Sequence, residues 1–560
     1  MKRNKIASIL NCLLALLTTV GFPVAATAAG GQLVSNPVNL SSKNYTNPII
    51  FSDYSDPDVT ASADGRTFYL TASSFQCTPG LPILKSTDLV NWELVNYALP
   101  ELPDSRYDRV QHGKGVWAPS IRFHNGEYYI YWGDPDLGIF MVKTSDPEGE
   151  WSKPVCVLSG RGIIDTTPLW DEDGRVYLVN AWAASRSGFN SIITVSELSP
   201  DGTKIISNPR IVFDGNDGVN HTVEGPKFYK KDGWYWIFAP AGGVVDGWQL
   251  AMRSRNVYGP YEPRIVMAQG KTDINGPHQG AWVDTPDGRS WFLHFQDRGA
   301  YGRIIHLNPM EWKNGWPVIG ADPDGDGCGE PVKTYTRPAP ADRSLTPDTH
   351  QSPMFYEWHA NYAPDNFGYP TYDGMMRIYS HRCDSTYTNL WDVSNLWLQK
   401  FPAEKFTMTA KVRISAKQNA EGVASGLVVM GWDYCTFGAV KTADSFTLTM
   451  AQCTDAEQKG VEKVSEIATL SPTRTYTAGL IANMELDLWL RLEVTEDAMC
   501  SFAYSTDGKK FTSAPASFKA RAGKWIGAKA GFYSIAPAGI PERGWIDVLD
   551  VTITTPDHKR

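Results

Sequence analysis

The chain has 560 residues, which is too long for one ordinary hydrophobic core, so we expect two or more domains. Its 42% hydrophobic and 20% charged residues are typical of a soluble globular protein. The net charge of −9 provides no basic surface, which makes nucleic acid and anionic membranes poor candidates for partners.

Residues 1–28 have the organisation of a secretory signal peptide. The stretch MKRNKIASILNCLLALLTTVGFPVAATAAG has a basic tip, an apolar run and a small-residue site at Ala26-Thr27-Ala28. We expect cleavage near residue 28 or 29 and a secreted or periplasmic protein without a membrane span. Seven scattered cysteines then remain, without CxxC spacing, which argues against a zinc site and a disulfide framework. A single pair, such as Cys435 with Cys453, stays open.

A turn glycine followed by an aromatic-rich strand occurs five times between residues 45 and 335. The five stretches are DPDVTASADGRTFYL from Asp56, WAPSIRFHNGEYYIY from Trp117, DTTPLWDEDGRVYLV from Asp165, EGPKFYKKDGWYWIF from Glu224 and QGAWVDTPDGRSWFL from Gln279. Each has an Asn-Gly or Asp-Gly turn between two strand patterns, and further strands follow. Recurrence at intervals of 48 to 61 residues predicts a five-bladed β-propeller over residues 45–335.

The residue nine positions before each turn glycine defines a register through the repeats. These register residues are Asp56, Trp117, Asp165, Glu224 and Gln279. Equivalent positions of propeller blades lie at similar distances from the central axis, so we expect the five side chains to meet at one mouth of the channel. Each carboxylate taken alone is explained as well by ordinary turn chemistry, but three at one register favour a functional site.

The rest of the chain predicts a second all-β domain. The run DPDGDG from Asp322 fails as an EF-hand, because its twelfth position is Lys333 rather than Glu. Residues 336–352 are rich in Pro and polar residues and predict a linker. Over residues 353–557, alternating patterns such as FTMTAKVRI from Phe406 and LDLWLRLEV from Leu486 predict a β-sandwich.

Three carboxylates around one funnel suit the hydrolysis of a glycosidic bond. This reaction needs a protonated acid for the leaving oxygen and an ionised carboxylate that activates water or attacks directly. Alternate blades lie across the channel, so we expect Asp56 and Glu224 at the separation of roughly 6.5–9.5 Å that leaves room for a water. Asp165 would raise the pKa of the acid, because like charges disfavour ionisation of a neighbour.

The chain resembles glycoside hydrolase family 43 over essentially all of residues 45 to 335. The resemblance rests on YSDPDV, SSFQCTPGLPILKSTDLVNW, GVWAPSIRFHNGEYYIYW, IDTTPLWDEDGRVYLV, VEGPKFYKKDGWYWIF, NGPHQGAWVDTPDG and HFQDRGAYGRIIHLNPMEW. It implies a five-bladed propeller that cleaves arabinose- or xylose-containing glycans with inversion. It also implies that Asp56 is the general base, Glu224 the general acid and Asp165 the residue that tunes and orients the acid. Where this chain has Asp165-Thr166-Thr167, the family often has Asp-Pro-Ser, but the carboxylate is retained.

The same resemblance implies further site residues. Trp117 and Phe75 match aromatic residues that shape the sugar subsite, although packing between blades is the alternative for both. Arg303 matches an arginine that reaches the substrate pocket, and His278 matches a pocket histidine. The resemblance implies no required cofactor and allows a structural calcium ion in the channel, with His278 as its ligand. One histidine is a weak metal signal.

The second domain resembles the concanavalin-like domain of β-xylosidase-type members, in which a loop covers part of the active-site mouth. The sandwich that only stabilises the propeller and the sandwich that binds carbohydrate are the alternatives. The main hypothesis is therefore an exo-acting enzyme that removes terminal α-L-arabinofuranosyl or β-D-xylosyl units. An inactive carbohydrate-binding propeller and an endo-acting arabinanase or xylanase of the family stay open. A sialidase-type propeller is disfavoured, because the stretch STDGKKF occurs once and outside the repeats.

Overall fold

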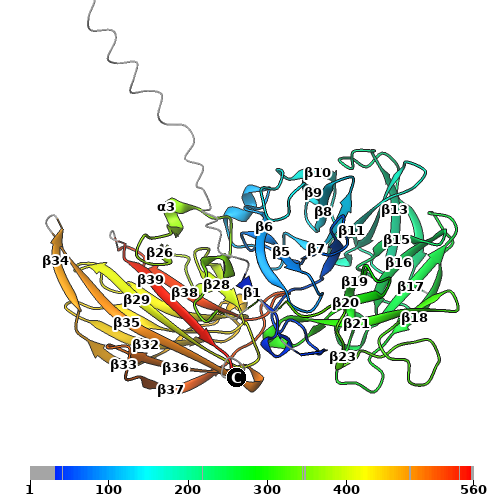
Figure 1. Ribbon diagram of the computed structural model, residues 1–560. Coiled ribbons are helices and arrows are strands. Elements are labelled where there is room, and N and C mark those ends of the chain that lie inside the picture. The colour runs from blue at the N-terminus through cyan, green and yellow to red at the C-terminus, as the bar shows by residue number, and fades with distance from the viewer. Residues whose placement is uncertain are drawn as a thin grey trace, which may run out of the picture. The chain divides into compact units, whose positions relative to one another are not determined.

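A computed structural model describes residues 32–556, apart from positions 41, 217, 343–344, 346–347, 479–480 and 541–542 (Figure 1). The predicted signal peptide, residues 1–28, lies outside the described residues. Strands dominate the described chain, which confirms the all-β class. Its short α-helices are α1 (Ala184–Ser187), α2 (Gly243–Asp246) and α3 (Pro364–Phe367). Single 3-10 turns span Pro37–Asn39, Ser105–Asp108, Gly299–Tyr301, Pro353–Phe355, Leu390–Asp392, Ala456–Gln458 and Glu496–Ala498.

Five antiparallel sheets follow one another along the first part of the chain. The first contains β1 (Gln32–Leu33), β3 (Asp58–Ala61), β4 (Phe68–Thr71), β5 (Gly80–Ser86) and β6 (Glu93–Leu99). The second contains β7 (Trp117–His124), β8 (Glu127–Asp134), β9 (Gly138–Thr144) and β10 (Val155–Ser159). The third contains β11 (Ile163–Trp170), β12 (Val176–Trp182), β13 (Ile192–Leu198) and β14 (Arg210–Asp214). The fourth contains β15 (Lys227–Lys231), β16 (Trp234–Ala241), β17 (Trp248–Ser254) and β18 (Glu262–Met267). The fifth contains β19 (His278–Asp284), β20 (Ser290–Asp297), β21 (Arg303–Lys313) and β22 (Trp316–Ile319).

These sheets close into a ring. Strand β3 contacts β7, β7 contacts β11, β11 contacts β15, and β19 contacts both the fourth sheet and β3. A separate apolar cluster fills each junction between neighbouring sheets; the one between the fifth and first sheets, for example, joins Leu293 to Leu70. The predicted five-bladed propeller is confirmed, with β3, β7, β11, β15 and β19 around its centre.

Two short strands tie the ends of the propeller together. Strand β2 (Asn44–Thr46) pairs antiparallel with β23 (Thr334–Thr336). Just beyond β23, the Arg337 guanidinium donates to Asp88 Oδ2 of the first blade at 2.5 Å and to the Asn39 carbonyl. The start of the predicted linker is thus held against the propeller by a buried ion pair.

The C-terminal part is a sandwich of two eight-stranded sheets. One sheet contains β24 (Tyr356–Trp358), β27 (His381–Arg382), β28 (Trp397–Lys400), β30 (Ala424–Met430), β31 (Tyr434–Lys441), β32 (Phe446–Cys453), β33 (Lys463–Leu470) and β38 (Lys529–Ala536). The other contains β25 (Gly368–Tyr369), β26 (Met376–Tyr379), β29 (Phe406–Lys417), β34 (Arg474–Ala478), β35 (Ile481–Thr495), β36 (Met499–Ser505), β37 (Thr512–Lys519) and β39 (Trp545–Thr554).

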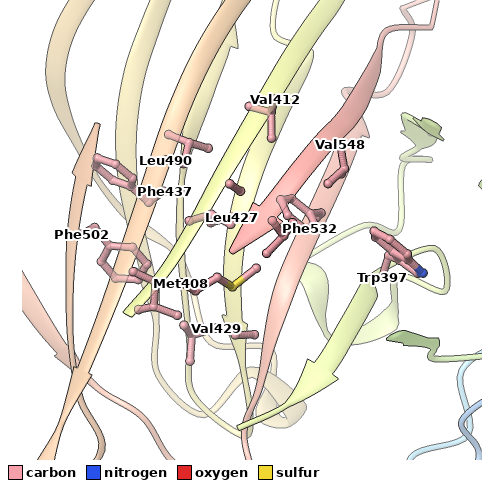
Figure 2. Close-up of a cluster of buried hydrophobic side chains, with 14 of the residues drawn as sticks. Trp397, Met408, Val412, Leu427, Val429, Phe437, Leu490, Phe502, Phe532 and Val548 are labelled. Carbon is pink, nitrogen blue, oxygen red and sulfur yellow. The ribbon is translucent and has the colours of Figure 1, made fainter. Parts of the chain in front are cut away.

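The alternation in the sequence explains the core of this sandwich. Every second residue of β29 from Phe406 to Ile414 is buried, and the same holds for β35 from Leu486 to Val494. Successive side chains of a strand point to opposite faces, so one face of each strand joins the core. Figure 2 shows this core between the sheets, with Met408, Val412 and Leu490 from one sheet and Leu427, Phe437 and Phe532 from the other.

The structure contradicts the cysteine pair that the sequence left open. Cys435 lies opposite Gln452, and Cys453 lies opposite Tyr434, so the two thiols point to opposite faces of their sheet. Cys435 packs in the core between the sheets, whereas Cys453 packs beneath Leu390 on the other side. All seven described cysteines are free thiols. Among the described helices, none has the length and apolarity required to span a bilayer.

Candidate active site

One cavity collects side chains from all five blades. It is lined by Asp56, Phe75, Trp117, Ala118, Ile164, Asp165, Glu224, Val244, His278, Gln279, Arg303 and Trp525. All seven residues that the sequence predicts as catalytic or substrate-binding lie in this lining, and so do all five register residues. Trp525 comes from the sandwich and the other lining residues from the propeller.

The inner strands approach the cavity through residues in the left-handed backbone conformation. Asp56, Ala118, Asp165, Gly225 and Gln279 have φ values of 56°, 35°, 58°, 60° and 33°. This conformation costs an L-residue roughly 1–2 kcal/mol. At the same place the pairing register shifts in β7, β11 and β19, so each of these strands carries a bulge that redirects its side chains.

The predicted equivalence of the five register residues is wrong in two blades. Asp56, Asp165 and Gln279 are themselves left-handed, whereas Trp117 and Glu224 lie one residue before the left-handed position. All five still line the cavity, because residues one position before the left-handed residue also reach it. Ile164 and His278 are examples.

Turn length explains the error. In the second and fourth blades the turns are Asn125-Gly126 and Asp232-Gly233, and both residues of each turn are left-handed, as a tight two-residue hairpin requires. In the third and fifth blades the longer loops 171–175 and 285–289 separate the paired strands. The number of residues between the left-handed residue and the turn glycine therefore differs between blades.

Asp56 is held between a hydroxyl donor and a guanidinium. Its side chain is 7% exposed, its Oδ2 accepts a 2.6 Å hydrogen bond from Ser73 Oγ, and its Oδ1 lies 3.6 Å from Arg303 Nη1. Ser73 Oγ in turn accepts from the Ala118 N–H, so the first two blades share this contact. A hydroxyl donor and a guanidinium both favour the charged form of an acid.

Asp165 lies deeper and is electrostatically opposed by its neighbours. Burial raises its pKa well above the ordinary value, and the negative charges of Glu224 and Asp56 raise it further. The Gly225 N–H, which donates to Asp165 Oδ2 at 2.8 Å, and the Lys227 ammonium act in the opposite direction. Asp165 therefore retains its proton to higher pH than an isolated aspartic acid does.

Glu224 is the most accessible of the three acids. Its side chain is 32% exposed and its Oε1 lies 2.9 Å from His278 Nε2, whereas the His278 side chain is 1% exposed. An accessible acid can exchange its proton with solvent. The cavity therefore places three carboxylates in different environments, as acid–base chemistry requires.

Comparison with known proteins assigns the chain to a family. Residues 45–317 match Glycosyl hydrolases family 43, and residues 348–552 match the Beta xylosidase C-terminal Concanavalin A-like domain. A putative beta-xylosidase from Xylanibacter ruminicola is 34% identical over 496 residues, which cover 87% of this chain and 85% of that protein. The chain belongs to glycosyl hydrolases family 43.

Other family 43 proteins are similar over part or all of the chain. A non-reducing end alpha-L-arabinofuranosidase from Bacteroides ovatus is 32% identical over 305 residues, or 51% of this chain and 55% of that protein. The crystal structure of a xylan beta-1,4-xylosidase from Bacillus halodurans matches with a TM-score of 0.75 at 19% identity, covering 91% of this chain and all of the other. This structural match shows the shared fold.

Aromatic side chains form much of the wall of this family 43 cavity. Trp117 donates from Nε1 to the Gly113 carbonyl at 3.0 Å, and its ring meets the edge of Trp525 with centroids 6.2 Å apart. Phe75 is left-handed and is held by two backbone hydrogen bonds with Val116. Trp525 is also left-handed and half exposed.

The residue analysis of the sequence missed four lining residues, namely Ala118, Ile164, Val244 and Trp525. The first two flank the register positions and follow from the bulges. Val244 lies on α2, after two left-handed glycines. This pair of glycines is a signal that is visible in the sequence. Trp525 has no local signal, although the family resemblance implied a covering loop from the sandwich.

Asp53 links this sandwich loop to the catalytic pocket. Its Oδ2 accepts from the Gly527 N–H at 2.9 Å, and its Oδ1 accepts from the Arg303 N–H at 2.9 Å. Two residues before Arg303, the Tyr301 hydroxyl bonds to backbone atoms of the sandwich and its ring joins the sandwich core. The positions of Arg303 and Trp525 are therefore set together.

The calcium role of His278 stays a prediction. Calcium takes six to eight oxygen ligands, whereas His278 offers nitrogen and directs Nε2 at Glu224. Within the described ranges, the one group of three acidic, His or Cys side chains with ligand atoms within 4.8 Å is Asp322, Asp324 and Asp326, two of them exposed. The donors around His278 do not fit calcium by themselves, and we derive no step through a metal.

Proposed function

We propose that this protein is an exo-acting glycoside hydrolase that removes terminal α-L-arabinofuranosyl or β-D-xylosyl units from plant cell-wall glycans. The observation that supports it most is the meeting of Asp56, Asp165 and Glu224 in one cavity with aromatic walls. The relatives named beta-xylosidase and arabinofuranosidase supply the two candidate sugars. The partner is therefore an oligo- or polysaccharide, and the reaction as written needs no cofactor.

The proposed reaction is a single displacement with inversion. Glu224 donates its proton to the departing glycosidic oxygen as the bond from that oxygen to the anomeric carbon breaks. Asp56 accepts a proton from water, whose oxygen forms the new bond to the anomeric carbon from the opposite face. Asp165 serves to tune and orient the acid Glu224, and Arg303 offsets part of the negative charge of the carboxylates and can bind a sugar hydroxyl.

Trp525 supports removal of terminal units rather than internal cleavage. Its ring meets Trp117 across the cavity, so the sandwich contributes a wall to the sugar pocket. We further propose residues 45–335 as the catalytic domain, 336–352 as the linker and 353–557 as the domain that supplies this wall. A signal peptide over residues 1–28 would place the enzyme outside the cytoplasm.

The first prediction tests the role of Glu224 as the general acid. Glu224→Gln should lower kcat/KM for nitrophenyl arabinofuranoside and xyloside by about 10²–10⁴-fold, because general acid catalysis contributes that much. Dinitrophenyl pentosides should lose less, since their leaving group needs little protonation. The matched control is Glu172→Gln, whose side chain is 89% exposed on the third blade.

Each further outcome of this assay has a stated meaning. Turnover of neither pentoside by the native chain would refute the proposal and favour a binding propeller. Long oligosaccharides from arabinan or arabinoxylan, instead of single pentoses, would refute the exo mode. Activity that is lost on chelation and restored by calcium would refute the mechanism without a metal.

A further inference from the structure

Asp53 is a buried carboxylate beside the cavity that the proposed reaction does not use. It is 4% exposed and lies three positions before Asp56. Its Oδ1 accepts hydrogen bonds from the Arg303 N–H at 2.9 Å and from the Ser55 hydroxyl at 3.2 Å, whereas its Oδ2 accepts from the Gly527 N–H at 2.9 Å. One buried side chain therefore binds the backbone of the fifth blade and that of the sandwich at the same time.

The two backbones that Asp53 joins also pack directly against each other. A Cβ at Gly302 would lie 2.4 Å from the Asp53 carboxyl carbon, and a Cβ at Gly527 would lie 2.7 Å from the Gly302 nitrogen. Beside these glycines, the Ala528 N–H donates to the Ala300 carbonyl at 2.7 Å. Because only glycine leaves room for these approaches, Asp53, the fifth-blade turn and the sandwich loop form one closely packed unit.

The side chains carried by these two backbones meet again at the cavity. Arg303 Nη1 lies 3.6 Å from Asp56 Oδ1, and the guanidinium carbon lies 5.9 Å from the centroid of the Trp525 ring. Trp525 is two residues before Gly527 in the sandwich loop. Backbones and side chains thus form a closed circuit of contacts, in which Asp53 fixes how Arg303 and Trp525 lie relative to each other.

The two acceptor oxygens of a carboxylate explain why an acid stands at position 53. Backbone N–H groups only donate, so two of them on different sides of one side chain need an acceptor at each end. Asparagine has the same shape but presents one oxygen and one NH2 group. It can therefore satisfy one of the two donors and places a donor against the other.

We propose that Asp53 is a positioning residue of the sugar pocket, which holds Arg303 of the propeller and the Trp525 loop of the sandwich in one fixed relation, so that the pocket is complete only while the sandwich is docked. The inference rests on the proposed function, because it takes the cavity as the pocket for the terminal sugar. A displacement of about 1 Å near a reacting centre can cost about 10²-fold in rate. Loss of one Asp53 hydrogen bond therefore reaches the substrate through Arg303 and Trp525.

The first test compares Asp53→Asn with the native full chain on a nitrophenyl pentoside. The variant should lose about 10–100-fold in kcat/KM, mostly through a higher KM, because a displaced wall weakens the binding of substrate and transition state alike. Asp108→Asn is the matched control: Asp108 also accepts a hydrogen bond from the sandwich, from Asn361 Nδ2 at 3.2 Å, but neither residue lines the cavity. Its KM should stay native. A native KM in Asp53→Asn would overturn the proposal.

A double-mutant cycle separates positioning from a general effect on the fold. Trp525→Ala alone should raise KM. Adding Asp53→Asn to it should change KM by a factor that is smaller by about 3-fold or more than in the native background, because the loop that Asp53 holds no longer carries the ring. A merely structural role of Asp53 would give independent effects on KM that multiply, and this result would overturn the proposal.

A readout without turnover keeps the inference separate from the proposed function. Amide hydrogen exchange is followed over residues 300–305 and 523–530 in the native chain, in Asp53→Asn and in Gly527→Ala. The alanine breaks the same contact from the sandwich side, because its Cβ would lie 2.7 Å from the Gly302 nitrogen. Both variants should speed exchange in both segments by about 10-fold, since a hydrogen bond to a charged group is lost or displaced.

Each outcome of the exchange measurement decides the role of Asp53. Asp108→Asn should leave both segments native. Faster exchange in one segment without the other would overturn the proposal, as would native exchange in both. If Asp53→Asn does not fold in a thermal melt, native exchange over residues 300–305 in Gly527→Ala overturns the proposal and faster exchange there supports it. If the native chain hydrolyses neither pentoside, the proposed function fails, whereas the exchange result still decides whether Asp53 couples the two segments.

Discussion

At the scale of single residues, the active site is built at a cost to the fold. Asp56 and Asp165 are left-handed and buried, and both belong to a group of three like charges. Strain and repulsion of this kind persist only where the surrounding structure fixes them. The hydrogen bonds from Ser73 to Asp56 and from Gly225 to Asp165 provide that fixation.

Asp165→Asn should stabilise the protein as pH rises while it impairs catalysis. The folded-state pKa of Asp165 is raised, so its contribution to stability is fully present below the unfolded pKa of about 3.8 and is lost as pH rises toward the folded value. Over that window the unfolding free energy of the variant should gain about 1.4 kcal/mol per pH unit relative to the native chain. Asparagine tolerates the left-handed backbone, so strain is unchanged.

The measurement is urea unfolding between pH 4 and pH 8. Asp173→Asn, on an exposed turn of the same blade, should show a difference from the native chain that does not grow with pH. A constant difference for Asp165→Asn would contradict the raised pKa. kcat/KM on a nitrophenyl pentoside should fall, because Asp165 is proposed to orient the acid Glu224.

At the scale of elements, the residues at the start of the inner strands, and those just before them, decide which side chains reach the cavity. Gly225, two residues before β15, has φ 60°, and a Cβ there would lie 2.6 Å from the Gln279 side chain. Its N–H also holds Asp165. Glycine is therefore required at this position by both the backbone and the adjoining blade.

Gly225→Ala should lower the unfolding free energy by about 1–2 kcal/mol for the left-handed backbone, with a further loss from the collision with Gln279. Gly126→Ala isolates the backbone contribution, because that turn glycine has φ 84° and a methyl group there would meet no other atom within 4 Å. Only Gly225→Ala should also reduce kcat/KM. Equal losses of stability and no loss of activity in both variants would contradict this account.

The sequence predicted the strands and turns themselves better than it predicted which residues are equivalent between blades. Asn125-Gly126 and Asp232-Gly233 form the tight hairpins that their residues favour, and alternation predicted β29 and β35. The count of nine residues back from the glycine could not place Trp117 and Glu224 correctly, because it assumes one turn length. Bulges and loop lengths arise from packing between blades, which a single repeat does not encode.

At the scale of the whole molecule, a buried ion cluster joins the two domains. Glu357 Oε1 accepts from Lys529 at 2.7 Å and from Lys400 at 3.2 Å, and Lys529 Nζ lies 3.1 Å from Cys77 Sγ of the propeller. Burial would raise the pKa of Glu357, but Lys400 and Lys529 together hold it below its ordinary value. Next to this cluster, Trp358 and Thr78 exchange backbone hydrogen bonds between the domains.

Glu357→Gln should destabilise the protein by about 3–5 kcal/mol, because it leaves two buried ammonium groups without a counter-charge. Glu148→Gln, which breaks a surface pair with Lys85, should cost about 0–1 kcal/mol. Both values come from urea unfolding of the full chain. Similar small losses in the two variants would show that the cluster does not hold the domains together.

The contact between the domains also limits what could be predicted. The propeller repeats pointed to Asp56, Asp165 and Glu224, because each lies in a recognisable stretch. Trp525 follows RAGK in a segment without periodicity, and its place in the cavity depends on how a second domain packs. No pattern within one domain reports such a contact.

The position of Trp525 has a consequence for how such enzymes diversify. One wall of the sugar pocket is encoded far downstream of every acid that would perform the reaction. Changes in that distant segment can alter which glycan fits while the reactive groups keep their arrangement. Substrate specificity can thus evolve independently of the catalytic reaction within one polypeptide.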